Sequence, residues 1–281
     1  MKLLVCLATL CSLAMTGHAA AQTAPGAPVG TPPGTEPGGE GPSLAVPQFG
    51  AWLDDATIEG RGVGRVTAGV GYWRTVGGTQ TDAPMIDAGY GVSDRIYISA
   101  FVPFYRATIG GQSMRGLDDL YLSAKFVVKN AATEGGRFGL AVSPAMEILS
   151  GAFTSGDRVH WALPVSAEVR ARPVRIYMTG GYFSRGALFG GAALEWTAPT
   201  ASVVWVSLTD SFALETGTDL PLPAGDRHRV DIAVGVAHPL NSRLAAYVSV
   251  GRTLSDVSAG GASLGAGGGI SVRLSRSTSA H

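Results

Sequence analysis

The chain has few cysteines, few charged residues and no excess of either charge sign. Cys6 and Cys11 are its only cysteines, and both lie near the start of its 281 residues. If that start is removed, no thiol remains for a disulfide, a thiolate-bound metal or a cysteine nucleophile. Twenty-one Lys and Arg residues balance 21 Asp and Glu residues, so the basic surface that a nucleic-acid-binding protein needs is absent. We therefore expect no nucleic acid as a partner.

Long apolar runs are also absent from most of the chain. After residue 21 no apolar run reaches 18 residues, the length typical of a membrane-spanning helix. The shorter run Leu3–Met15 follows Lys2 and precedes Ala19–Ala21, which is the three-part pattern of a secretory signal. We predict that residues 1–21 are a signal peptide cleaved after Ala21.

Residues 22–48 are dominated by proline and glycine. Such a composition buries little apolar area and favours an extended, solvated chain. We predict a disordered periplasmic linker here, followed by a pre-barrel segment at residues 49–61.

From residue 62 to residue 274, apolar residues recur with a period of two in about twelve segments separated by turn signals. In residues 97–104, for example, Ile98, Val102 and Phe104 share one face and Tyr97 and Phe101 share the other. Several segments reach the ~9–11 residues that a tilted strand needs to cross a membrane, beyond the ~5–6 of a soluble strand. Alternation alone fits both a soluble β-sandwich and a membrane barrel.

The apolar faces favour the barrel because their aromatic residues fall at two heights with aliphatic residues between them. At one height we place Tyr72, Phe104, Trp161, Tyr182 and Phe212, and at the other Tyr90, Phe126, Phe138 and Trp196. The sequence therefore predicts an all-β, antiparallel transmembrane β-barrel of about 12 strands over residues 62–274. A polar tail at residues 275–281 follows it, and the bacterial outer membrane is the expected location.

The opposite faces of these strands are expected to line the interior. Because unpaired charges in a confined interior are costly, their nearly equal acids and bases predict cross-strand ion pairs around a wet lumen. Bulky aromatic residues among them predict a constriction, and serve either as a path for small aromatic solutes or as filler that stiffens the wall. The predicted lumen-lining residues are Asp87, Tyr97, Phe101, Asp119, Tyr121, Lys125, Arg137, Glu147, Glu168, Arg170, Arg175, Glu195, Trp205, Arg229, Asp231, Arg243 and Arg273.

Enzyme and metal motifs are not found. No two histidines have the spacing of a metal site, and the one local hydrolase arrangement is Ser143 or Ser166 near His160. Two such polar residues arise easily by chance. We expect no catalytic residues, no metal and no cofactor.

One motif points to a known family. The run Arg115–Leu120, followed by Lys125-Phe126, and the run Gly181–Gly186 resemble an outer-membrane family named for the meta-pathway of phenol degradation. The resemblance implies a transporter for aromatic compounds, with outer-membrane lipid, a small apolar or aromatic solute and the barrel-assembly machinery as partners. The chain departs from outer-membrane barrels in lacking a terminal aromatic residue, since a polar tail follows Leu274. The alternatives are a structural or adhesive barrel with a plugged lumen and a soluble periplasmic β-protein.

Overall fold

The computed structural model describes residues 53–131, 137–149, 158–184, 186–214, 228–255 and 261–275. The predicted signal peptide, the predicted linker and nearly all of the predicted tail lie outside these residues. Among the described residues, no helix has the length and apolar character needed to cross a membrane.

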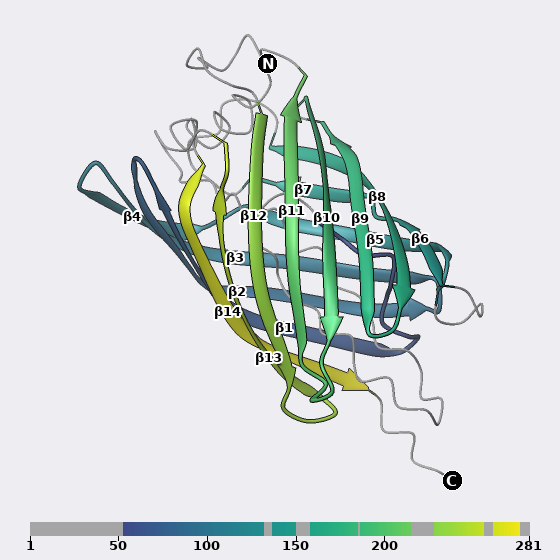
Figure 1. The fold of residues 1–281 in the computed structure, drawn as a ribbon. Coiled ribbons are helices and arrows are strands. Elements are labelled where there is room, and N and C mark those ends of the chain that lie inside the picture. The colour runs from purple at the N-terminus through teal and green to yellow at the C-terminus, as the bar shows by residue number, and fades with distance from the viewer. Residues whose placement is uncertain are drawn as a thin grey trace.

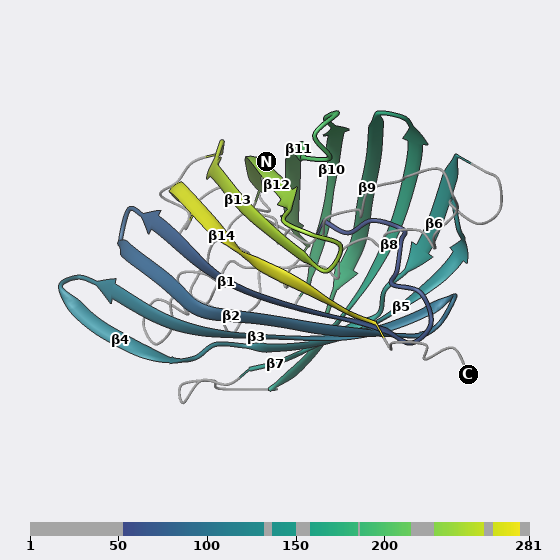
Figure 2. The same ribbon diagram turned by 90° about the horizontal axis from the view of Figure 1, so that it is seen from below.

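The described residues form one antiparallel sheet that closes on itself (Figures 1 and 2). Its strands are β1 Val63–Thr75, β2 Gly78–Ser93, β3 Ile96–Ile109, β4 Gln112–Leu117, β5 Leu120–Lys129, β6 Phe138–Val142, β7 Ala145–Ile148, β8 Val159–Ala171, β9 Val174–Phe183, β10 Ala187–Thr197, β11 Val203–Ala213, β12 His228–Pro239, β13 Leu244–Thr253 and β14 Ala262–Ser275. Closure comes from β1 and β14, which pair from Val63↔Ser275 to Thr75↔Ala262.

Two wall strands are each broken in the middle. β4 and β5 both pair with β3, and only Asp118 and Asp119 separate them. β6 and β7 both pair with β8, and only Ser143 and Pro144 separate them. The wall therefore has twelve strands, which confirms the predicted antiparallel barrel.

The alternation in the sequence becomes an alternation in exposure, with the apolar side facing out. In β8, Trp161 and Val165 are 54% and 44% exposed, whereas Ser166 and Glu168 between the outward residues are buried. The same holds for the two predicted aromatic groups, which are exposed except for the half-buried Tyr182. An apolar outer surface with a polar inner one is the reverse of a soluble protein and suits a lipid surrounding.

The start of β1 and the finish of β14 lie at the same end of the barrel, which we call the terminal end. β1 starts there and β14 finishes there, close to the β12–β13 connection at the bottom of Figure 1. The connections at this end include the short turns at residues 94–95, 172–173 and 240–243. At the opposite end β7 finishes at Ile148 and β8 begins at Val159, and β11 finishes at Ala213 and β12 begins at His228.

Candidate functional site: the lumen and its N-terminal plug

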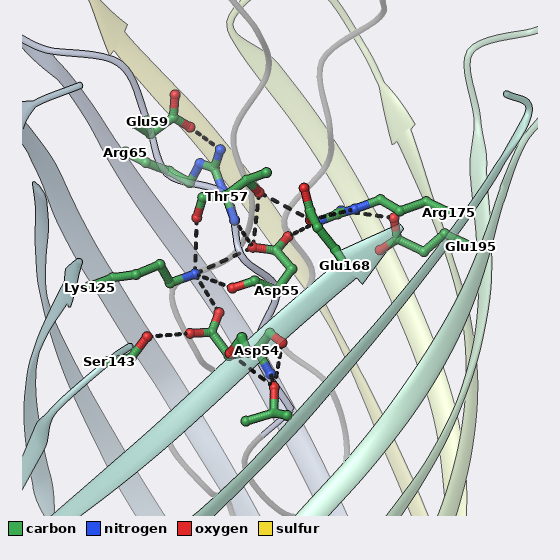
Figure 3. Close-up of polar contacts among 12 residues, drawn as sticks. Asp54, Asp55, Thr57, Glu59, Arg65, Lys125, Ser143, Glu168, Arg175 and Glu195 are labelled. Atoms are coloured by element: carbon green, nitrogen blue, oxygen red, sulfur yellow. Dashed lines mark hydrogen bonds and ion pairs between the residues drawn. The ribbon is translucent and has the colours of Figure 1, made fainter. Parts of the chain in front are cut away.

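A short segment ahead of β1 lies inside the barrel. All seven residues of Leu53–Glu59 are buried, and we call this segment the plug. Figure 3 shows Asp54, Asp55 and Thr57 between Lys125 on one side and Arg175 on the other, with wall strands around them. The plug leads directly into the first wall strand, since the amide of Gly62 donates to the Gly91 carbonyl at 2.8 Å.

Lys125 is the first of the wall cations that hold the plug. Its ammonium group lies 2.5 Å from Oδ1 of Asp54 and 3.3 Å from Oδ1 of Asp55. It also donates to the backbone carbonyls of Asp55 and Thr57, each at 3.0 Å. β5 carries Lys125 inward between the outward Ala124 and Phe126, so its full burial follows from its place in the alternation. Ser143, in the β6–β7 break, donates to Oδ2 of Asp54 at 2.9 Å.

Arg175 is the second cation and joins the plug to two wall acids. Its guanidinium group pairs with Asp55 and lies 2.7 Å from Glu168 and 3.0 Å from Glu195. These acids sit on β8 and β10, the two neighbours of β9, so the group bridges three strands. It also lies over the ring of Tyr177, with 4.9 Å to the ring centroid.

Two further cations of the wall, Arg65 and Arg273, hold the end of the plug. Arg65 on β1 pairs with Glu59, whose side chain is fully buried, and Arg273 on β14 lies 3.2 Å from the same carboxylate. Because β1 and β14 form the seam and Arg65 is opposite Arg273 in the register, Glu59 lies between two like charges. The carboxylate therefore offsets their repulsion across the seam.

The surroundings of the two plug aspartates shift their pKa values in opposite directions. Burial raises the pKa of Asp54 to about 6, against the lowering effect of Lys125. Burial also acts on Asp55, but Arg175 and Lys125 together outweigh it and lower the pKa of that carboxyl. Asp55 is therefore the firmly ionised partner, and Asp54 is the group that titrates more easily.

The plug also makes apolar contacts with the wall. Leu53 packs with Tyr177 and Ala193, while Ala56 and Ile58 pack with Tyr97, Val127 and Ala141. The backbone amide of Asp54 donates to Oγ1 of Thr179 at 2.7 Å. The plug thus presents carboxylates to cations and apolar groups to the aromatic and small residues of the wall.

A second region of the interior is aromatic. Phe101 and Tyr121 lie with their ring centroids 6.3 Å apart, and the Tyr121 hydroxyl donates to Glu147 at 2.7 Å. Trp205 lies over Gly235 on the neighbouring strand, where a Cβ atom would overlap its indole ring. The absence of a side chain at Gly235 therefore lets the ring lie along the wall. These side chains form one cluster, whose larger members are Trp73, Met85, Phe101, Tyr121, Trp205 and Tyr247.

The structure places most of the predicted lumen-lining residues inside the barrel. The buried ones are Asp87, Tyr97, Phe101, Asp119, Tyr121, Lys125, Glu147, Glu168, Arg175, Glu195, Trp205, Arg229 and Asp231. Arg170 and Arg273 are partly buried. It brings Lys125, Glu168, Arg175 and Glu195 together around the plug, and Arg229 and Asp231 form a separate pair at 2.7 Å.

Two predicted lining residues are exposed. Arg137 and Arg243 are exposed, each one residue before the start of its strand, β6 or β13. Their backbones still pair with the neighbouring strands. The carbonyl of Arg137 accepts from the amide of Arg170 at 2.8 Å, and the carbonyl of Arg243 accepts from the amide of Arg273 at 2.7 Å. An exposed side chain can still face a wet lumen, so the lumen-lining role of these two residues stays a prediction.

Sequence reasoning missed the three plug acids, Asp54, Asp55 and Glu59. The prediction of cross-strand ion pairs holds for Arg175 with Glu168 and Glu195, but Lys125 and Arg65 pair with the plug. The available signal was a group of acids directly ahead of the first strand, next to a wall with slightly more bases than acids.

The two serines of the possible hydrolase arrangement contact other side chains. Ser143 donates to Asp54, and the Ser166 hydroxyl lies 3.2 Å from Oγ1 of Thr179. The ring of His160 contacts that of Phe183. Within the described ranges, no group of three or more His, Cys, Asp or Glu residues could hold a metal ion.

The closed wall, the apolar exterior and the charged interior define the fold of an outer-membrane β-barrel. Solved structures agree. An outer membrane channel from Pseudomonas putida F1 is similar with a TM-score of 0.57 and 14% identity, over 78% of this chain and 98% of that chain. The NanC porin is similar with a TM-score of 0.53 and 8% identity, over 74% of this chain and 100% of that chain.

No family model matches the sequence, and no curated protein matches it. Membership of the phenol meta-pathway family therefore stays a prediction.

Proposed function

We propose that this chain forms a channel in the bacterial outer membrane for small solutes with an apolar or aromatic part. The observation that carries the proposal is the inverted distribution of side chains, with apolar residues outside and charged residues inside a closed wall. A soluble β-sandwich buries its apolar faces against each other and leaves polar faces in water. An apolar outer surface around a polar interior instead fits a wall between lipid and an aqueous path.

The inward aromatic cluster supports the solute class. Phe101 and Tyr121 are cross-strand partners on β3 and β5, and Trp205 on β11 belongs to the same buried group. Aromatic faces attract aromatic solutes by about 0.5–1.5 kcal/mol beyond the effect of burial. A path lined in this way favours a phenolic solute over a sugar of similar size.

A structural barrel with a closed lumen is a second candidate function. The observation that favours it is the plug, which is fully buried and tied to the wall by ion pairs at Lys125, Arg175 and Arg65. A plug held this way narrows the interior, so the two functions differ in whether solutes pass while it is seated.

Liposome uptake distinguishes the two candidates. Purified protein is reconstituted, and the entry of phenol is compared with that of a small sugar. The test variant combines Phe101→Ala with Trp205→Ala, and the control is Trp196→Ala on the exposed outer face. The channel predicts faster entry of phenol than of the sugar, a preference that the double variant loses and the control keeps. Entry of neither solute favours the structural barrel, and equal entry of both contradicts the aromatic path.

A further inference from the structure

The plug has the chemical make-up of a small apolar acid bound in a site. Its carboxylates meet Lys125 and Arg175, and its apolar side chains meet Tyr177 and Tyr97. Cationic and apolar groups thus lie side by side on the wall facing one short segment. A wall that recognises this pattern in its own chain offers the same contacts to a solute that carries it.

The contacts of Asp54 are specific to a carboxylate. Lys125 reaches its Oδ1 at 2.5 Å, and Ser143 donates to its Oδ2 at 2.9 Å, so each oxygen has its own donor on the wall. Lys125 lies on β5 and Ser143 in the adjacent β6–β7 break, which fixes the spacing of the two donors. Charge-assisted hydrogen bonds of this kind are about twice as strong as neutral ones.

The second carboxylate contact is held in place by the wall itself. Glu168 and Glu195 bind the guanidinium group of Arg175 from the two neighbouring strands and leave its contact with Asp55 on the plug side. Arg175 is therefore positioned whether or not the plug is seated. The cation also lies over the Tyr177 ring, which supplies an apolar surface beside the charge.

We propose that Lys125, Ser143 and Arg175 form a binding site for the carboxylate of a small aromatic or aliphatic acid, which the plug occupies in the resting protein. The proposal rests on the channel function above and names the charge of its solute. A solute acid and the plug compete for the same donors. Because the plug is tethered to the wall, its carboxylates act at an effective concentration of about millimolar or more, so they mask the site from a free acid.

The test measures the binding of benzoate to the full-length protein in detergent by calorimetry. The variant combines Asp54→Asn with Asp55→Asn, which keeps the shape of the plug and removes its charge. We expect benzoate to bind this variant about tenfold or more tightly than the wild type, because the masking carboxylates are gone. Benzyl alcohol has the same ring without the charge and should show no gain.

Two controls make the result specific. Asp210→Asn applies the same chemical change to an exposed acid on the outer side of β11, and it should leave benzoate affinity at the wild-type level. Adding Lys125→Gln to the double variant should remove the gain. A double variant with unchanged benzoate affinity, an equal gain for benzyl alcohol, or a gain that survives Lys125→Gln would each overturn the proposal.

Binding and passage are measured separately, so the two proposals fail separately. If the protein binds benzoate as expected but admits no solute to liposomes, the binding-site proposal stands and the channel proposal fails. If the protein admits phenol but the double variant gains no benzoate affinity, the channel proposal stands and the binding-site proposal fails. If the double variant does not fold, Asp54→Asn alone removes the carboxylate that Lys125 and Ser143 hold, while Asp55 keeps its contacts with both cations, so a smaller gain in benzoate affinity is expected. Unchanged benzoate affinity in that single variant overturns the proposal.

Discussion

The ammonium group of Lys125 lies 2.5 Å from Oδ1 of Asp54, although 71 residues separate the two along the chain. One residue belongs to a wall strand and the other to the segment ahead of the first strand. Neither side chain is exposed beyond 2%. The plug is therefore fixed by charges that water screens little, and removing either partner leaves the other buried without its counter-ion.

Replacing Lys125 with Met is expected to destabilise the folded barrel by about 3–5 kcal/mol, because it leaves the plug carboxylates without their cation. Urea unfolding of the protein in vesicles measures the change. Lys129→Met is the matched control, since Lys129 is exposed on the same strand, over the ring of Phe138. We expect the control to change stability by less than about 0.5 kcal/mol. Similar losses for the two variants would contradict the structural role of Lys125.

Gly91→Ala is expected to disturb the exit of the plug. A Cβ atom at Gly91 would overlap the carbonyl oxygens of Glu59 and Gly60, which are backbone atoms and cannot rotate away. Overpacking of this kind costs about 1–3 kcal/mol. Gly64→Ala, at the same end of the barrel, would place its Cβ 3.6 Å from the nearest atom and should be milder. Heat-modifiability on gels compares the two, and an equal loss of heat resistance would argue against close packing at the exit.

Val248→Arg tests the orientation of the wall. Val248 lies in the middle of β13 and is 55% exposed on the outer side. An arginine at the lipid midplane of a barrel costs about 2–4 kcal/mol. Val248→Leu keeps the apolar character and should be nearly neutral. Refolding titrations into vesicles give both values, and an arginine variant as stable as the leucine variant would refute the lipid-facing assignment.

The stability of the barrel should carry a pH dependence from Asp54. Its pKa is about 6 in the folded chain against 3.8 as the ordinary value, so between these pH values the folded state holds a proton that the unfolded chain has released. The stabilisation that comes from the raised pKa of Asp54 is fully present below pH 3.8, and it is lost as the pH rises through about 6. Asp54→Asn cannot titrate, so the wild type should lose stability relative to this variant between about pH 4 and about pH 6. Unfolding midpoints at several pH values test this, and a constant difference would count against it.

The wall was predictable from the sequence because its rule is local. In a strand the side chains alternate strictly, so Trp161 and Val165 face out and Glu168 faces in whatever lies elsewhere in the chain. The rule does not say how exposed a residue at a strand end is, as at Arg137 and Arg243. It also does not foresee that the wall strands break at Asp118–Asp119 and at Ser143–Pro144.

The plug was not predictable because nothing in residues 53–59 is periodic. Its position depends on pairs such as Lys125 with Asp54 and Arg175 with Asp55, which are 71 and 120 residues apart. Such pairings depend on how the whole wall arranges its cations in space. A count of acids and bases indicates that ion pairs exist but does not identify the partners.

The seam between β1 and β14 has a consequence for the order of folding. It joins residues near the two ends of the described chain, such as Arg65 and Arg273, so its loop-closure entropy is among the largest in the molecule. Contacts of such long sequence separation form slowly, and the seam is expected to close late. Since the plug enters the wall through the seam strand β1, the wall can close around a plug that is already in place. Glu59, which faces Arg65 and Arg273, would then draw the two seam strands together as the barrel forms.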